Sequence, residues 1–142
     1  MFSIAFIFLF FSLIADPYIS EQTGSLFPSD DLSGKWSSVN DSVSLDLNLT
    51  QSGDSIKGYH CSIKANENKI DCSMEGDAVG FTIRGIVKGN TSTVTFVSTF
   101  SMKPGEAVIT RKGKLLYWKI TIAPEGEFYI PKEAVLKSTD KK

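Results

Sequence analysis

Two-residue alternation of apolar and polar side chains runs through most of this chain and limits the folds that it can adopt. In "VSLDLNLT" the apolar residues at positions 43, 45, 47 and 49 share one face, and polar residues occupy the other. Similar runs follow as far as "LLYWKITIA" and are separated by short turns such as "SGDS", "GN" and "MKPG". This period of two is typical of half-buried β-strands, and a helical period is suggested only by "PKEAVLKS" near the end.

About eight strands at this short spacing predict an all-β domain. Consecutive hairpins favour a single small antiparallel up-and-down barrel over a Greek-key sandwich, and closure of a barrel removes the strand edges that would otherwise pair with other chains. We expect the barrel over residues 33–138, after a polar leader at 16–32 and before a polar tail at 139–142.

The alternation also predicts which side chains fill the barrel. We expect Tyr59 and Cys61 in phase with Ile63, with His60 on the opposite face. The residues expected to point inward are bulky: Leu45, Leu47, Leu49, Ile63, Phe81, Ile83, Phe96, Phe100, Trp118 and Ile120. At the packing density of protein interiors such residues favour a filled core. An eight-stranded barrel can also hold one small ligand, which is the alternative.

The first fifteen residues, "MFSIAFIFLFFSLIA", form an apolar stretch that we interpret as a signal peptide or hydrophobic export segment. The stretch is shorter than the roughly 20 residues that a membrane-spanning helix needs. No Lys or Arg precedes Lys35, so the basic start of a signal peptide is missing and an uncleaved anchor is the alternative. We expect an exported protein without a membrane span in its mature chain, periplasmic if bacterial and otherwise secreted.

Two cysteines support export. Cys61 and Cys72 flank the polar turn "KANENK", and folding this stretch as a hairpin brings them opposite each other. We therefore expect a disulfide, which suits an oxidising compartment. Two cysteines without neighbouring ligands make a poor zinc site and lack CxxC spacing, and no metal or cofactor is expected. Use of the N-x-S/T triplets at Asn40, Asn48 and Asn90 for glycans stays open.

Two short motifs carry a family resemblance. Gly34 and Trp36 in "LSGKW" open the strand pattern, and Gly58 and Tyr59 stand in "SIKGYHCS". Together with the order of strands, these fragments resemble the calycin superfamily, which includes lipocalins, fatty-acid-binding proteins and avidins. The resemblance implies that Gly34 and Trp36 close one end of the barrel. Biotin binding is not expected, because Cys61 stands where avidins have a ligand-contacting serine.

Catalytic chemistry is not expected. The chain has no Gly-x-Ser-x-Gly elbow, HExxH helix or phosphate-binding glycine loop, and one histidine, His60, which we interpret as a surface or hydrogen-bonded residue. The acidic residues Asp46, Asp71, Glu75 and Asp77 mostly occupy expected outward or turn positions. A formal net charge of −1 also argues against a general nucleic-acid binder.

The sequence therefore favours a non-catalytic binding protein that contacts a protein partner. We expect an inhibitor or immunity protein that neutralises a cell-wall-degrading toxin or lysozyme-like enzyme. The basic hairpin tip of Arg111, Lys112 and Lys114 is a candidate contact. The alternative is a lipocalin-like carrier of a small apolar ligand, whose interior contacts would be Tyr59, Phe81, Phe96 and Trp118.

Overall fold

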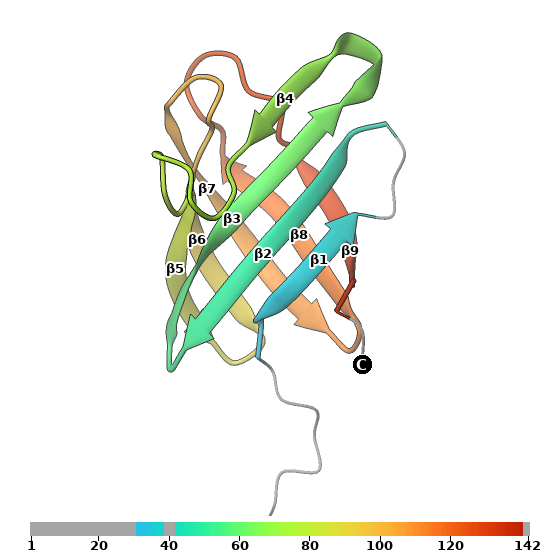
Figure 1. The fold of residues 1–142 in the computed structure, drawn as a ribbon. Coiled ribbons are helices and arrows are strands. Elements are labelled where there is room, and N and C mark those ends of the chain that lie inside the picture. Colours follow the sequence, from blue (N-terminus) through green and yellow to red (C-terminus); the bar gives the residue numbers. More distant parts are fainter. Residues whose placement is uncertain (1–30, 39–41, 141–142) are drawn as a thin grey trace, which may run out of the picture.

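The computed structural model describes residues 31–38 and 42–140, which form a closed antiparallel β-barrel (Figure 1). The predicted all-β up-and-down barrel is thereby confirmed. The expected export segment at 1–15, most of the leader at 16–32 and the triplet at Asn40 lie outside the described residues. Among the described residues, none belongs to a helix long and apolar enough to cross a membrane. The strands are β1 (Gly34–Ser38), β2 (Ser44–Ser52), β3 (Ser55–Lys64), β4 (Lys69–Cys72), β5 (Ile83–Lys88), β6 (Thr91–Val97), β7 (Pro104–Lys112), β8 (Leu115–Ile122) and β9 (Glu133–Ser138).

Eight of these strands follow one another around the barrel, and β9 pairs with β1 to close it. The additional strand, β4, follows β3 through the 3-10 turn η1 (Ala65–Glu67). β5 pairs with the first half of β3 and β4 with the second half, so these two strands share one position in the wall. Two backbone hydrogen bonds extend the pairing with β3 beyond β4 and β5. Ser73 N, just after β4, donates to His60 O (2.9 Å), and Thr82 N, just before β5, donates to Gly58 O (3.0 Å).

The two ends of the barrel differ. At the end that we call the turn end, two-residue turns join β2 to β3, β5 to β6 and β7 to β8. Gly53, Gly89 and Gly113 take φ angles of 61°, 62° and 61° there, in the left-handed region that such tight hairpins require. The opposite end, which we call the loop end, carries the loops 98–103 and 123–132 and the β3–β4 hairpin tip (Figure 1).

Large side chains fill the interior. Phe96 and Trp118 are 0% and 1% exposed, and their rings meet edge to face at 5.3 Å between centroids. Such pairs stabilise a core beyond the area that they bury. The same cluster includes Leu32, Trp36, Leu45, Leu47, Leu49, Ile56, Ile83, Val87, Val94, Ala107, Ile109, Leu116, Ile130 and Leu136.

The predicted facing of β3 is wrong. His60 and Ser62 are the buried, inward residues of this strand, whereas Tyr59 and Cys61 lie on the outer side and Ile63 is 38% exposed. The interior near the loop end is polar, so here the hydrophobic residues of the alternating pattern mark the outer face. Asp71 on β4, expected at an outward or turn position, is also fully buried.

Two expected core phenylalanines are also placed differently. Residues 77–82 precede β5 as turn and irregular chain, so Phe81 lies outside the barrel and stacks on Tyr59 at 4.8 Å between ring centroids. Phe100 belongs to the loop 98–103 and is 46% exposed. In both cases the strand is shorter than the alternating sequence suggests, because the residues at one end of the alternating run belong to a loop.

Candidate functional site

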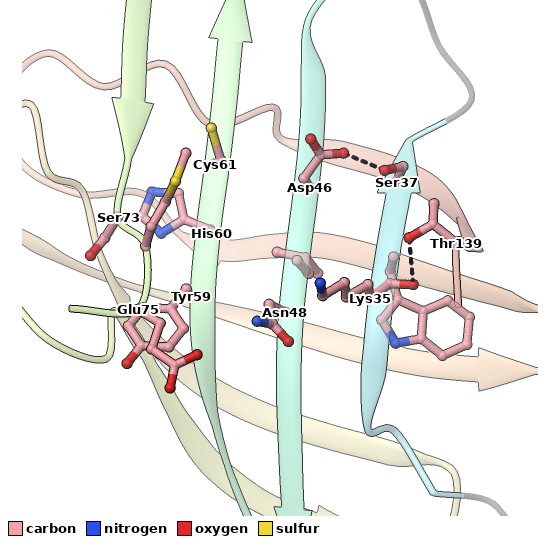
Figure 2. A pocket seen from close by; sticks show the side chains of 13 residues that line it. Lys35, Ser37, Asp46, Asn48, Tyr59, His60, Cys61, Ser73, Glu75 and Thr139 are labelled. Atoms are coloured by element: carbon pink, nitrogen blue, oxygen red, sulfur yellow. Dashed lines mark hydrogen bonds between the residues drawn. The ribbon is translucent and has the colours of Figure 1, made fainter. Parts of the chain in front are cut away.

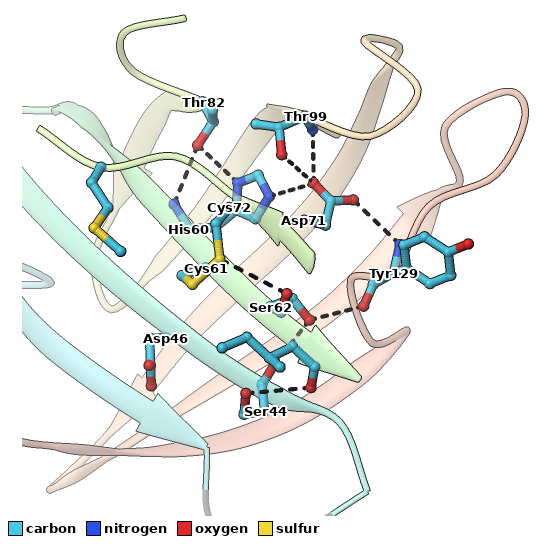
Figure 3. Close-up of a disulfide and its surroundings, with 12 residues drawn as sticks. Ser44, Asp46, His60, Cys61, Ser62, Asp71, Cys72, Thr82, Thr99 and Tyr129 are labelled. Carbon is cyan, nitrogen blue, oxygen red and sulfur yellow. Dashed lines mark hydrogen bonds and ion pairs between the residues drawn. A yellow bond between two sulfur atoms is a disulfide. The ribbon is translucent and has the colours of Figure 1, made fainter. Parts of the chain in front are cut away.

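The carboxylate of Asp71 holds the loop end together (Figure 3). Its Oδ2 accepts hydrogen bonds from Ser98 Oγ (2.6 Å) and from the Tyr129 amide (3.3 Å). Its Oδ1 accepts from the Thr99 amide (2.7 Å) and from Thr99 Oγ1 (3.0 Å). One side chain on β4 thus links the loop 98–103 to the loop 123–132.

His60 completes this cluster from β3. Its Nε2 lies 3.1 Å from Asp71 Oδ1, and its Nδ1 lies 2.8 Å from Thr82 Oγ1. An ionised carboxylate only accepts hydrogen bonds, so the ring hydrogen of this pair is assigned to Nε2. The three side chains are 1%, 0% and 2% exposed for His60, Asp71 and Thr82. A hydroxyl, an imidazole and a carboxylate in a line can support nucleophilic catalysis where they are accessible. Here all three side chains are fully buried, and their contacts join β3, β4 and the loop 73–82.

Hydrogen bonds keep Asp71 ionised. Burial acts to raise the pKa of this carboxyl group, but the hydrogen bonds from His60, Ser98 and Thr99 outweigh burial. The pKa of Asp71 is therefore held well below its usual range. An ionised Asp71 can accept hydrogen bonds from all the donors that surround it, and these bonds tie both loops to β4.

The loop 98–103 has hydrogen bonds between its own residues in addition to those with Asp71. Ser98 N donates to Lys103 O (3.0 Å), and Met102 N donates to Ser98 O (2.9 Å). Ser98 Oγ accepts from the amides of Phe100 (3.2 Å) and Ser101 (3.3 Å). Met102 has a φ of 57°, which is uncommon for a residue with a side chain. Such a conformation persists only where surrounding contacts determine it, and at loop tips it often marks a functional segment.

The rigid loop presents large apolar side chains to solvent. Phe100 is 46% exposed and Met102 is 57% exposed. The Phe100 ring packs against Tyr129 at 4.7 Å between centroids, and Lys69 Nζ lies 5.8 Å and 5.5 Å from the centres of these two rings. Other exposed apolar residues belong to the strands that reach the same end: Ile63, Ile70 and Ile122.

The predicted disulfide joins Cys61 to Cys72 and is confirmed (Figure 3). The two residues are direct partners in the β3–β4 ladder, on the outer side of the wall. Each lies next to a member of the buried cluster, since His60 precedes Cys61 and Asp71 precedes Cys72. The disulfide therefore fixes the register of β4 that brings Asp71 against His60.

Replacing both cysteines by serine is expected to lower the free energy of unfolding by about 3 kcal/mol, because the unfolded chain loses a short closed loop. Each single substitution should cost about as much as the double one, since either removes the same bond. Urea denaturation of the three variants tests this expectation, with the reduced wild-type protein as the matched control. Additive costs would contradict it.

A groove of about 420 Å³ lies on the outer wall beside the disulfide, with polar and apolar residues in its lining (Figure 2). Lys35, Asn48, Tyr59 and Glu75 are among its lining residues. Ser37 Oγ donates to Asp46 Oδ1 (2.5 Å) at its rim. Within the described residues, no group of three or more His, Cys, Asp or Glu side chains is arranged to hold a metal ion.

The residues expected to close one barrel end lie together near the turn end. Trp36 is 2% exposed, its indole Nε1 donates to Leu32 O (3.1 Å), and Arg111 Cζ lies 5.4 Å from its ring centre. Gly34 has a φ of 126°, and a Cβ there would lie 2.5 Å from Asp140 Oδ2, which accepts a hydrogen bond from Lys35 N. The backbone angle therefore favours glycine at position 34, and a side chain there would also have to displace the Asp140 carboxylate from Lys35 N.

Two of the three residues of the basic hairpin tip, Arg111 and Lys112, make contacts within the fold. Arg111 covers Trp36, donates from Nε to Gly113 O (3.0 Å) and also donates to Asp31 O. Lys112 Nζ lies 5.1 Å from the centre of the Tyr117 ring, while Lys114 is exposed. Of the three residues proposed for partner contact, Lys114 is the one for which no such contact is found.

The four residues expected to contact an interior ligand do not share one space. Phe96 and Trp118 are packed in the core, whereas Tyr59 and Phe81 stack on the outer wall. The interior placement of the latter two is wrong: Tyr59 lies on the outer face of β3, and Phe81 lies in the irregular chain that precedes β5. The loop end was missed because its hydrogen bonds join residues far apart in the sequence. The pairing of the two cysteines, which puts their neighbours His60 and Asp71 close together, was a signal that could have indicated it.

Comparisons with protein-family models, with curated proteins and with solved structures give no match to this chain. The geometry of the loop end therefore carries the functional argument.

Proposed function

We propose that this chain is an exported, non-catalytic protein that binds a protein partner through its loop end. The observation that carries the proposal is the exposure of Phe100 and Met102 on a loop fixed by the buried Asp71 carboxylate. Aromatic residues and methionine are enriched in the centres of protein interfaces. Apolar side chains that lie exposed together on a protein surface often mark a site of contact with a partner.

The rigidity of the loop supports binding as its role. A loop that is already ordered loses little conformational entropy when a partner binds. The hydrogen bonds of Ser98 and Thr99 to Asp71 supply that order before contact. A few well-placed side chains can then contribute most of the binding energy.

The partner class that we propose is a cell-wall-degrading toxin or lysozyme-like enzyme, which this protein would inhibit. A short hydrogen-bonded loop that presents a half-exposed aromatic side chain has a shape suited to a concave substrate cleft. The disulfide is compatible with an oxidising compartment, where such enzymes act on cell walls. The protein would thus act as an inhibitor or immunity protein in the periplasm or outside the cell.

A lipocalin-like carrier is less well supported. Such a role needs an interior space of roughly 300 Å³ or more that a ligand can enter. The interior here is occupied by buried side chains such as Phe96, Ile109 and Trp118, each 0–1% exposed. Three grooves on the described residues are lined mainly by residues of the outer wall and the turn end.

The test of the proposal is the double substitution Phe100→Ala with Met102→Ala. The wild-type protein is expected to inhibit at least one of a panel of purified muramidases in a cell-wall turbidity assay. The double variant should lose inhibition by about 30-fold or more, since two interface residues of this kind can each contribute over 1 kcal/mol. Its thermal midpoint should stay near the wild-type value, because both side chains are substantially exposed.

Ile86→Ala is the matched control, since Ile86 is 51% exposed but lies on the outer wall, on β5 near the turn end. It should inhibit as the wild type does. Equal inhibition by the double variant would exclude the loop end as the contact. If no muramidase is inhibited, the proposed enzyme class is wrong. A lipid that stays bound in native mass spectrometry would favour the carrier instead.

A further inference from the structure

Two positive side chains face each other on the outer wall, away from the loop end. Lys57 on β3 and Arg84 on β5 are direct partners in the antiparallel ladder, and both are exposed. Like charges directly opposite each other on neighbouring strands destabilise a sheet. A pair of this kind therefore needs another contribution that offsets the repulsion.

Part of this contribution comes from one aromatic ring. Lys57 Nζ lies 4.6 Å from the centre of the Phe81 ring, and Arg84 Cζ lies 5.3 Å from it. Phe81 is itself held by its contact with Tyr59. Cations are attracted to the face of an aromatic ring, so Phe81 holds both charges in place at the same point of the wall.

Carboxylates do not neutralise the pair. The ion pairs found among residues 31–38 and 42–140 join His60 to Asp71, Lys64 to Glu67 and Lys119 to Glu133. Along the row of partners that starts at Arg84, Thr95 comes next and Glu106 follows it, two strands from Arg84. Neighbouring strands lie about 4.8 Å apart, so Glu106 starts roughly 10 Å from Arg84.

A groove of about 410 Å³ lies beside the pair. Its lining combines the two cations with the hydroxyl-bearing residues Thr50, Ser52 and Ser55, and it includes no acidic residue. Thr50 is the direct partner of Lys57 on β2, so hydroxyl, ammonium and guanidinium groups follow one another across three strands.

We infer that this groove binds a phosphate or sulfate group. The guanidinium group of Arg84 can donate two parallel hydrogen bonds to such an oxyanion, and the ammonium group of Lys57 adds a point charge. The exposed hydroxyl groups of Thr50, Ser52 and Ser55 can donate further hydrogen bonds. The bound anion would neutralise the repulsion between the two cations. This site is separate from the loop end and does not depend on the function proposed for that end.

Titration of the isotope-labelled full chain with inorganic phosphate, followed by NMR, tests the site. Saturable amide shifts are expected at Thr50, Ser55, Lys57 and Arg84. Titration with a sulfated heparin tetrasaccharide distinguishes a free anion from one carried on a glycan. Tighter binding of the tetrasaccharide, with shifts at the same residues, would identify a glycan-borne group as the better ligand. Shifts with phosphate alone would identify a small-molecule site.

Lys57→Gln and Arg84→Gln are each expected to weaken binding by about tenfold, the equivalent of one lost charge-assisted hydrogen bond. Arg84→Lys should recover only part of the affinity, because it keeps the charge but loses the planar pair of donors. Lys112→Gln is the matched control, since Lys112 also lies over an aromatic ring, that of Tyr117, but has Leu115 as its partner.

The inference is overturned if phosphate and the tetrasaccharide produce no saturable shifts in the wild-type protein. It is equally overturned if Lys112→Gln weakens binding as much as Lys57→Gln, because this result would indicate general attraction to positive charge. The thermal midpoint of each variant is measured as well, so that a loss of binding can be distinguished from a loss of folded protein.

Discussion

Asp71→Asn is expected to lower the free energy of unfolding by about 3–5 kcal/mol at neutral pH, because it breaks a buried charged cluster. The NH2 group of Asn would replace one of the two accepting oxygens, so its own donors would face either Ser98 and the Tyr129 amide or Thr99 and His60. Since Asp71 is fully buried, water cannot replace the lost hydrogen bonds. Urea denaturation at pH 7 measures this loss.

The same variant should change the response to acid. The pKa of Asp71 is lower in the folded state than in the unfolded state, so the unfolded chain takes up this proton first as the pH falls. The stability contributed by Asp71 is complete above the unfolded pKa of about 4 and is lost progressively below it. Wild-type stability should therefore fall more steeply between pH 5 and pH 2 (roughly the range of carboxyl titration) than that of Asp71→Asn.

Asp46→Asn provides the comparison. Asp46 accepts a hydrogen bond from Ser37, but it lies exposed on the outer wall. Its substitution should change the free energy of unfolding by about 0.5 kcal/mol or less. If Asp71→Asn keeps the acid dependence of the wild type, the buried cluster is not the source of that dependence.

Trp36→Ala is the second substitution with a large expected effect. Trp36 is 2% exposed and contacts both the chain entering β1 and the β7–β8 hairpin, through Leu32 O and Arg111. Removing it should cost about 3–5 kcal/mol, since a large cavity opens in the core and Arg111 loses the ring that it covers. Thermal or urea denaturation measures the loss.

Trp36→Phe should recover more than half of the lost stability, because it retains an aromatic ring for Arg111 and fills most of the space. Tyr117→Ala is the control for an aromatic residue on the outer wall, where the ring is 36% exposed, and should cost much less. If Trp36→Ala were as mild as Tyr117→Ala, the indole would not be a major support of this barrel end.

The loop end could be predicted only in part. The turn "MKPG" is visible in the sequence, but the alternation assigned Ser98, Thr99 and Phe100 to the preceding strand, whereas they belong to the loop 98–103. The bonds that order the loop reach from Asp71 over 27 residues to Ser98 and over 58 residues to Tyr129. Contacts at such separation follow from the closure of the barrel, which no local pattern records.

The sequence by itself determined the class of fold and the disulfide. Alternation with a period of two requires strands with two different faces, and short glycine turns require neighbouring strands to be antiparallel. Eight such strands bury their apolar faces most completely when the sheet closes. The spacing of Cys61 and Cys72 around a hairpin turn likewise places them side by side.

Only the tertiary structure decided which face of β3 and β4 points inward. The alternation of "GYHCSIK" is equally regular in both orientations, and hydrophobicity favoured the wrong one. The orientation adopted buries His60, Ser62 and Asp71 because each finds a hydrogen-bond partner inside the barrel. Asp71 accepts from Ser98 and lies against His60, and Ser62 donates to the Tyr129 carbonyl. A buried carboxylate is stable only when its partners are all in place, and those partners come together only in the closed barrel.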